Sequence, residues 1–396
     1  MLSTVFSAAG ERLPFLSGAH ERLDAVRRFV TRGPDHRERL ADIDTRIVVS
    51  GTRGKSGTTE RLHDVFDARG YDTGAKITGN RPAMLRGDER RPITRGERVT
   101  LYENERELRE NPPDDVLVVE NQAISDYTTR MVAEQFVDPD VVVLTNVRRD
   151  HLDTLGGDRL AIARALARAI PAGTHVVNGE QSPALRECLE TELDRRGATV
   201  SHVSVPDEHA NVPGAESIYA LNEVLDAVGE EPLSRELLGG YLDEMRVEWR
   251  AIEGGHVFNA ASVNDTESTE VVRRALAADR PGTIQPLFYI RGDRRGRTAA
   301  FLEYLSECYE QGVFEQVRVA GDDTARFARR APFPVVRHDG DDPATVLDAA
   351  LDDGWPVFLV GNTVADFMRG MEAEVERRAA AAESTKPSSS NVEATR

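Results

Sequence analysis

A short glycine-rich segment, GTRGKSGTT (residues 51–59), follows the apolar run RIVVS. Gly51 and Gly54 allow the backbone to turn tightly and approach a phosphate, and the N–H groups that begin a following helix favour an anion. Lys55 adds a positive charge for the terminal phosphates, and the Ser56 hydroxyl can bind Mg²⁺. The segment is two residues shorter than the usual loop, G-x-x-x-x-G-K-[ST]. A turn with a chance lysine is the alternative, but the chain has only three lysines, which favours phosphate binding.

Two other apolar runs end in polar side chains that could complete such a site. VLVVE ends in Glu120, and VVVLTN ends in Asn146. Asp150, His151 and Asp153 follow the second run. In an open parallel sheet, ligands bind outside the carboxyl ends of the strands, which makes Glu120 a candidate Mg²⁺ ligand. A lone histidine is more often structural, but a histidine flanked by two aspartates at a strand end favours a metal or proton-transfer site.

The elements that would position these residues alternate between apolar strands and amphipathic helices. The runs before the polar residues are continuously apolar, as in strands buried on both faces of a parallel sheet. We therefore predict an α/β fold with a P-loop central domain over residues 46–248, whose sheet is mostly parallel. A helical segment (1–45) precedes it, and a smaller Rossmann-like α/β domain (249–378) follows. Residues 379–396 have the composition of a disordered tail.

Composition excludes some classes of protein. The chain has 68 acidic and 50 basic residues, for a net charge of -18, which argues against a nucleic-acid partner. An acidic, lysine-poor surface suits a high-salt cytoplasm, although a GC-rich genome would also favour arginine. We find no apolar run long enough to span a membrane and no signal peptide, and we expect a cytoplasmic protein. Cys188 and Cys308 lack metal spacing, and we interpret them as buried thiols.

The motifs together resemble the Mur ligase superfamily of ATP-dependent amide ligases, which share the shortened loop. The resemblance rests on the loop, on Glu120 and on T-N-x-x-x-D-H-x-D at residues 145–153. Within the superfamily, the sequence most resembles the ligase subunits of poly-γ-glutamate synthesis (PgsB/CapB type). The segments shared with that branch are G-x-R-G-K-S in the loop, K-x-T-G at 76–79, N-D-x-x-S-T at 264–269 and R-x-D-R at 291–294. The resemblance covers about residues 46–370.

The sequence departs from the family pattern in three places. Muramyl ligases and folylpolyglutamate synthases commonly have a carbamylated lysine after the D-H-x-D motif, but residues 154–180 contain no lysine. Gly57 replaces the usual Ser or Thr after Ser56. The membrane-anchoring helix that often begins the poly-γ-glutamate branch has no counterpart here. We therefore expect no lysine-bridged metal pair, and we expect membrane association only at the periphery, through a partner.

The resemblance implies a reaction and its participants. ATP, with Mg²⁺, would phosphorylate a terminal carboxylate, and an amine would attack the resulting acyl phosphate to give an amide. Glutamate would be the amine donor and an anionic γ-glutamyl chain the acceptor. A small membrane protein is a further possible partner. The C-terminal domain would close over the nucleotide.

The resemblance also implies roles for individual residues. The catalytic residues would be Lys55, His151, Asp150 and Arg294. Nucleotide binding would involve Gly51, Thr52, Arg53, Gly54, Lys55, Ser56, Gly57, Asn146, Asn264 and Asp265. The metal ligands would be Ser56, Glu120 and His151. Asp150 would orient His151, and Lys76 and Arg81 could serve the acceptor chain or the acyl phosphate.

Several alternatives remain open from the sequence. NDTEST reads equally well as a strand end followed by a helix N-cap. RGDRRGR, which contains Arg294, could be a solvated basic loop or a site for an anion. The protein could instead ligate an amino acid to another small molecule, or be a P-loop NTPase or nucleotide-gated regulator that is not a ligase. A binding module that has lost catalysis is the remaining alternative.

Overall fold

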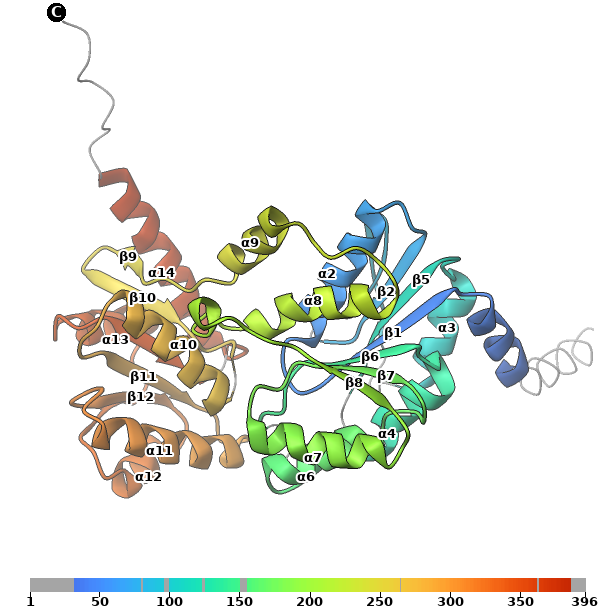
Figure 1. Ribbon diagram of the computed structural model, residues 1–396. Helices are drawn as coiled ribbons and strands as arrows, with labels where there is room; N and C mark the ends of the chain where they lie inside the picture. Colours follow the sequence, from blue (N-terminus) through green and yellow to red (C-terminus); the bar gives the residue numbers. More distant parts are fainter. Residues whose placement is uncertain are drawn as a thin grey trace, which may run out of the picture. The chain divides into compact units, whose positions relative to one another are not determined.

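The computed structural model describes residues 32–79, 81–95, 100–122, 125–149, 155–263, 265–361 and 363–385. The chain groups into two compact units (Figure 1). The first holds most of the chain up to Val203 together with Ala220–Pro232, and the second holds Ser204–Tyr219 and the chain from Leu233 onward. Each unit is an α/β layer structure around its own sheet, which confirms the predicted fold class. The domain boundaries expected from the sequence stay a prediction.

Within its described residues, the first unit has an eight-stranded sheet in the order β4-β3-β2-β5-β1-β6-β7-β8. The six strands β2, β5, β1, β6, β7 and β8 each run parallel to their neighbour in this order. β3 and β4 form an antiparallel edge beside β2. The strands are β1 (Thr45–Ser50), β2 (Thr73–Ile77), β3 (Ala83–Arg86), β4 (Glu89–Pro92), β5 (Val116–Glu120), β6 (Val141–Leu144), β7 (His175–Asn178) and β8 (Thr199–His202).

The apolar runs became the central strands of this sheet for the predicted reason. The central residues of β1, β5 and β6 are buried on both faces of the sheet, so they can be continuously apolar. Their register pairs Val49 with Glu120 and Ser50 with Leu144. The carboxyl ends of the three strands therefore meet at one edge. The β3–β4 hairpin was not predicted, because its charged residues (ERRP in β4) suit an edge strand and give no apolar signal.

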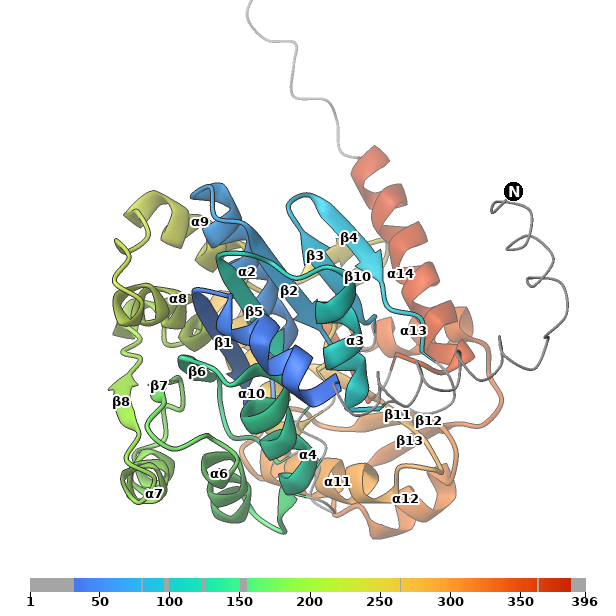
Figure 2. The same cartoon turned by 90° about the vertical axis from the view of Figure 1, so that its right-hand side faces the viewer.

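Helices bury the apolar faces of this sheet (Figures 1 and 2). They are α2 (Lys55–Ala68), α3 (Tyr102–Glu110), α4 (Asp126–Met131), η1 (Val132–Val137), α6 (Arg159–Arg168), α7 (Pro183–Asp194) and the part of α8 (Ala215–Ala227) from Ala220 onward. One core cluster packs α3, η1, α6, α7 and the helical residues 32–41 against the strands. α2 lies against β2 and β5 and buries Leu62 and Phe66. Burying each such side chain is worth about 1.5–3 kcal/mol, which fixes the start of α2 beside β1.

The second unit is doubly wound around a sheet that has six strands among its described residues, in the order β13-β12-β11-β14-β10-β9. Only β9 runs antiparallel to its neighbour there. Successive residues of one strand point to opposite faces: Phe288 packs in one core cluster with α10, α11 and α12, and Leu287 packs in another with α13 and α14. The strands are β9 (Arg250–Ile252), β10 (Gly255–Asn259), β11 (Gln285–Ile290), β12 (Val317–Gly321), β13 (Val335–His338) and β14 (Val357–Val360). The helices are η2 (Asp207–His209), α9 (Arg235–Glu244), α10 (Thr266–Asp279), α11 (Arg295–Glu310), α12 (Thr324–Arg330), α13 (Pro343–Leu351) and α14 (Asp366–Thr385).

Two expectations differ from the structure. The tail expected from residue 379 begins with helix, because α14 runs to Thr385 and buries Ala379 in the second unit's core. Cys188 is half-buried and not buried, whereas Cys308 is buried and its burial raises the pKa of the thiol to about 11. Among the helices of the described residues, none combines the length and apolar character that a membrane crossing needs.

Candidate active site

The glycine-rich loop connects the end of β1 to the start of α2. Gly51 and Gly54 have φ values of 111° and 81°, a left-handed region that glycine enters without steric cost. A Cβ at Gly51 would overlap the Oγ1 of Thr145. The glycines therefore let the loop lie directly on the end of β6 and still present the first turn of α2. A helix start of this kind has N–H groups available for an anion.

Lys55 is the first residue of α2 and lies back across the loop. Its Nζ donates to the carbonyl oxygens of Gly51 at 2.9 Å and Thr52 at 3.1 Å. The residue is only half-buried and lies at the carboxyl edge of the sheet. This position suits the predicted contact with a phosphate bound by the loop.

Ser56 and Glu120 meet at the same edge, as the sequence predicted. The Ser56 hydroxyl donates to Glu120 Oε2 at 3.0 Å. The backbone N–H of Thr78 donates to the same oxygen at 2.7 Å, and Glu120 is only 4% exposed. A Cβ at Gly79 would lie 3.0 Å from the Ser56 hydroxyl oxygen, so the segment that follows β2 lies close against this pair. A hydroxyl and a carboxylate are hard oxygen donors that fit Mg²⁺.

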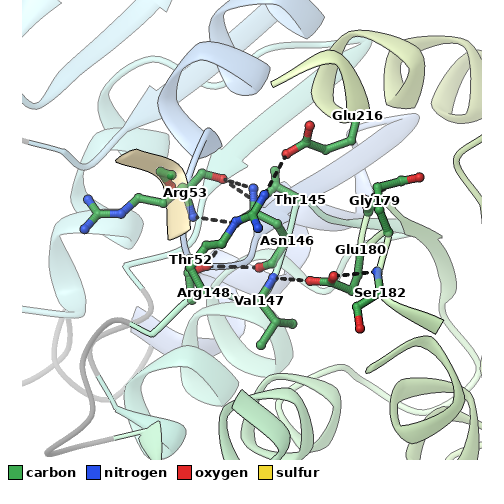
Figure 3. Close-up of polar contacts among 12 residues, drawn as sticks. Thr52, Arg53, Thr145, Asn146, Val147, Arg148, Gly179, Glu180, Ser182 and Glu216 are labelled. Carbon is green, nitrogen blue, oxygen red and sulfur yellow. Dashed lines mark hydrogen bonds and ion pairs between the residues drawn. The ribbon is translucent and has the colours of Figure 1, made fainter. Parts of the chain in front are cut away.

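Thr145 and Asn146 hold the loop in place (Figure 3). The Thr145 hydroxyl donates to the carbonyl oxygen of Arg53 at 2.6 Å. The Asn146 side-chain oxygen accepts from the Thr52 hydroxyl at 2.9 Å and from the Arg53 backbone N–H at 3.1 Å. Asn146 was predicted to contact the nucleotide. The structure gives its side chain a different partner, the loop itself, and the nucleotide contact stays a prediction.

Glu180, which sequence reasoning missed, supports the segment after Asn146 (Figure 3). Its Oε2 accepts from the Val147 N–H at 2.8 Å, and its Oε1 accepts from the Ser182 N–H at 2.8 Å. Arg159 donates to the carbonyl oxygen of Val147 at 3.0 Å. Glu180 lies just beyond β7, at the same sheet edge as Glu120. Its place after the strand THVVN was the available signal.

Three buried glutamates of α3 form a second charged region of the first unit. Glu103 accepts from Arg95 at 2.8 Å on both oxygens and lies 2.9 Å from Lys76 Nζ. Burial raises the pKa of Glu103, but the hydrogen bond from Arg95 and the charge of Lys76 outweigh it and lower the pKa to about 2. Burial lowers the pKa of Lys76, against the charge of Glu103. The other two glutamates also have arginine partners: Glu105 has Arg32 and Arg109, and Glu107 has Arg91 and Arg106.

Lys76 was predicted to lie in a K-x-T-G turn, but the structure places it in a strand. Lys76 lies in β2 and is 2% exposed, and its ammonium is neutralised by Glu103. Because the side chain is buried, the structure gives no support to the hypothesis that Lys76 contacts the acceptor chain. The region still reaches the candidate site, because Arg95 donates to the carbonyl oxygen of Thr78 at 3.0 Å. The N–H of Thr78 is the one that holds Glu120.

Two predicted residues of the second unit lie at helix starts. Asp265 is the N-cap of α10, and its Oδ1 accepts from the Ser268 N–H at 2.8 Å. This is the capping arrangement that the sequence left open as an alternative. Arg294 precedes α11 and is exposed, with its Nε 3.7 Å from Asp293. Contacts of either residue with a nucleotide or substrate stay predictions.

The remaining predicted residues are Arg81, Gly57 and four others. Arg81 is exposed. Asp150, His151, Asp153 and Asn264 lie outside the described residues. Gly57 lies in the first turn of α2, where a Cβ would be 3.0 Å from an Arg61 nitrogen. Within the part of the chain that the structure describes, no group of three His, Cys, Asp or Glu side chains could hold a metal. A metal at Ser56 and Glu120 would therefore need ligands from His151, from water or from a bound phosphate.

Comparison with known proteins gives two family matches. Residues 49–218 match the Mur ligase middle domain, and residues 246–378 match the poly-gamma-glutamate synthase CapB C-terminal domain. The capsule biosynthesis protein CapB of Bacillus anthracis is 25% identical over 286 residues, which are 67% of this chain and 61% of the relative. The PGA synthase CapB of Bacillus subtilis (strain 168) is 24% identical over 287 residues, 67% of this chain and 72% of the relative.

A solved structure shares the fold. The bifunctional folylpolyglutamate synthase/dihydrofolate synthase of Yersinia pestis, complexed with AMPPNP and a Mn ion, has a TM-score of 0.57 and 21% identity. The likeness covers 87% of this chain and 92% of that chain. At this sequence identity, the similarity shows a shared fold and nothing more.

Proposed function

We propose that this chain, whose residues 49–218 match the Mur ligase middle domain and whose residues 246–378 match the CapB C-terminal domain, is an ATP-dependent carboxylate–amine ligase. It joins glutamate to a γ-glutamyl chain through an acyl phosphate. The observation that carries the proposal is the pairing of Glu120 with Ser56, the residue after Lys55, at the end of a shortened phosphate loop. The names of the two CapB relatives support the γ-glutamyl product.

The proposed reaction has two steps. A carboxylate oxygen of the acceptor attacks the γ-phosphorus of ATP, and ADP leaves. The amine of glutamate then attacks the acyl carbon, loses a proton and expels phosphate. Negative charge accumulates on the transferred phosphoryl group, so preorganised positive charge and N–H donors provide most of the catalysis.

The chain's own residues divide this work. The loop amides and Lys55 bind the terminal phosphates, and Thr145 and Asn146 keep the loop in its binding shape. Ser56 and Glu120 would hold Mg²⁺, which would neutralise phosphate charge. Glu120 is oriented for this by the Thr78 N–H. We assign His151 to the second metal position or to the acyl phosphate, and Asp150 to orienting it. In the second unit we assign Asn264, Asp265 and Arg294 to contacts with the nucleotide or substrate.

We also propose where the reaction takes place. The acidic, lysine-poor composition supports a high-salt cytoplasm. A small membrane protein would bring the enzyme to the membrane periphery. Light scattering of the protein in low and in high salt tests the first point, because a protein adapted to salt should aggregate at low ionic strength.

The decisive experiment is a screen of ADP release across the amino acids, in high salt, with a γ-glutamyl acceptor present. We expect release that depends on both glutamate and the acceptor, and a large loss in Lys55→Ala. Release that needs the acceptor but accepts another amino acid would correct the donor. Release unchanged by any amino acid would point to an NTPase that is not a ligase and would overturn the proposal.

A further inference from the structure

A pocket in the second unit lies at the carboxyl ends of β11 and β12. It is enclosed by the first turns of α11 and by α12, and four of its lining residues are arginines: Arg291, Arg295, Arg326 and Arg330. Phe327 and Leu302 add an apolar wall. The carboxyl edge of a parallel sheet is where α/β domains bind ligands. The start of α11, a helix of 16 residues, adds the positive end of its dipole to the same place.

Three of these arginines have no acidic partner in the described structure. Arg295, Arg326 and Arg330 are exposed, and no ion pair or side-chain hydrogen bond joins them to another described residue. Arg291 is different, because it holds Asp293 at 2.9 and 2.6 Å. Asp323 is the one acidic residue among those that line the pocket. The pocket therefore concentrates positive charge in a chain whose net charge is -18.

The pocket has room for a small ligand group. Its cavity volume is about 70 Å³, several times the roughly 10–15 Å³ that a cavity needs to hold one water molecule. One carboxylate or phosphate group fits such a space. Arginine suits such a group because its planar guanidinium donates two parallel hydrogen bonds to the oxygens.

We propose that this pocket is an anion-binding site that holds a side carboxylate of the γ-glutamyl acceptor chain. The identity of the chain rests on the proposed function, whereas the anion site rests on the pocket. A γ-glutamyl chain carries one α-carboxylate on every residue, so one carboxylate in the pocket retains the chain between additions without contacting the reacting terminus. Free phosphate shares the same chemistry and is the competing ligand.

The test measures binding by calorimetry without ATP. The ligands are a synthetic γ-glutamyl oligomer, inorganic phosphate and glutamate alone. The variants are Arg295→Gln/Arg326→Gln/Arg330→Gln and, as a matched control, Arg329→Gln, an exposed arginine of α12 outside the pocket lining. We expect about tenfold or greater weakening of oligomer binding in the triple variant, because charge-assisted hydrogen bonds are lost. Arg329→Gln should stay within about twofold, as expected for a single exposed charge.

The same variants distinguish this inference from the proposed reaction. With full turnover, the triple variant should raise KM for the acceptor and leave kcat unchanged. If the triple variant binds the oligomer as the wild type does, the pocket assignment is overturned even where glutamate-dependent ADP release stands. If phosphate binds in the pocket and the oligomer does not, the site is one for a small anion and the chain assignment is overturned. Loss of oligomer binding in the triple variant supports the pocket even where the wild type releases no ADP with glutamate.

Discussion

Lys55 and Lys76 belong to the same unit, and their surroundings differ in a way that separates binding from stability. Lys55 rests on backbone carbonyls of its own loop and keeps part of its side chain exposed. Lys76 is buried in β2 and is neutralised by Glu103, which also holds Arg95. A half-exposed lysine at the start of the loop helix suits the proposed contact with a phosphate. The charge of a lysine paired in the interior is already compensated by its partner, so it attracts a phosphate only weakly.

The α3 glutamates and the arginine pocket of the second unit also differ in whether their charges have partners. Each buried glutamate of α3 has basic partners, whereas three exposed arginines of the pocket have none among the described residues. Within this acidic chain, paired charges are therefore candidates for structure and unpaired positive charges are candidates for ligand binding. Three predictions test the first pair of regions.

The largest effect is expected on stability. Glu103→Gln keeps the shape of the side chain but leaves Lys76 buried without a counter-charge, which should cost about 3–5 kcal/mol in the free energy of unfolding. Urea titration followed by circular dichroism measures it. Glu110→Gln, on the exposed face of the same helix, is the control and should change stability by no more than about 0.5 kcal/mol. Equal midpoints for the two variants would show that the pair is not structural.

A smaller free-energy change is expected from the loop lysine, and it should appear in turnover. Lys55→Ala should lower ATP turnover about 10²–10³-fold, the loss typical of removing one group that stabilises transition-state charge. Its unfolding midpoint should match the wild type. Lys76→Met should do the reverse, with a lower midpoint and wild-type turnover per folded molecule. If Lys76→Met lowers turnover even after correction for the folded fraction, then Lys76 also contributes to the reaction, and the two lysines do not differ as proposed.

The smallest effect is the pH dependence of the Glu103 pair. The pKa of Glu103 is lowered from 4.5 to about 2 in the folded state. The ionised carboxylate therefore stabilises the fold fully above about pH 4.5, and this contribution disappears as the pH falls through about 2. The shift corresponds to about 3 kcal/mol. We expect the stability difference between the wild type and Glu103→Gln to shrink by that amount between pH 5 and pH 2. A difference independent of pH would assign the loss to packing.

Much of the fold and part of the site were predictable because their signals are local. The buried strands are continuous apolar runs, and the loop glycines, Lys55 and Ser56 are consecutive in the chain. Since the strands are parallel, the position of Glu120 at a strand end was enough to place it near Ser56. The hairpin of β3 and β4 was missed because charged edge strands carry no apolar pattern. The tail was expected to be disordered from its first residue. Its helical start was missed because an alanine-rich, polar sequence does not reveal which residues pack against a core.

The sequence by itself determined a shortened phosphate loop, the α/β alternation and the carboxylate at the end of β5. Each of these depends on neighbouring residues whose apolar or conformational preferences act over a few positions. Only the tertiary structure decided that Asn146 holds the loop, that Glu180 supports the segment beyond it and that Lys76 is buried against Glu103. The partners in those contacts are separated by 27 to 94 residues. Strand pairing and helix packing brought them together, and the interior required each buried charge to find a counter-charge or a hydrogen bond.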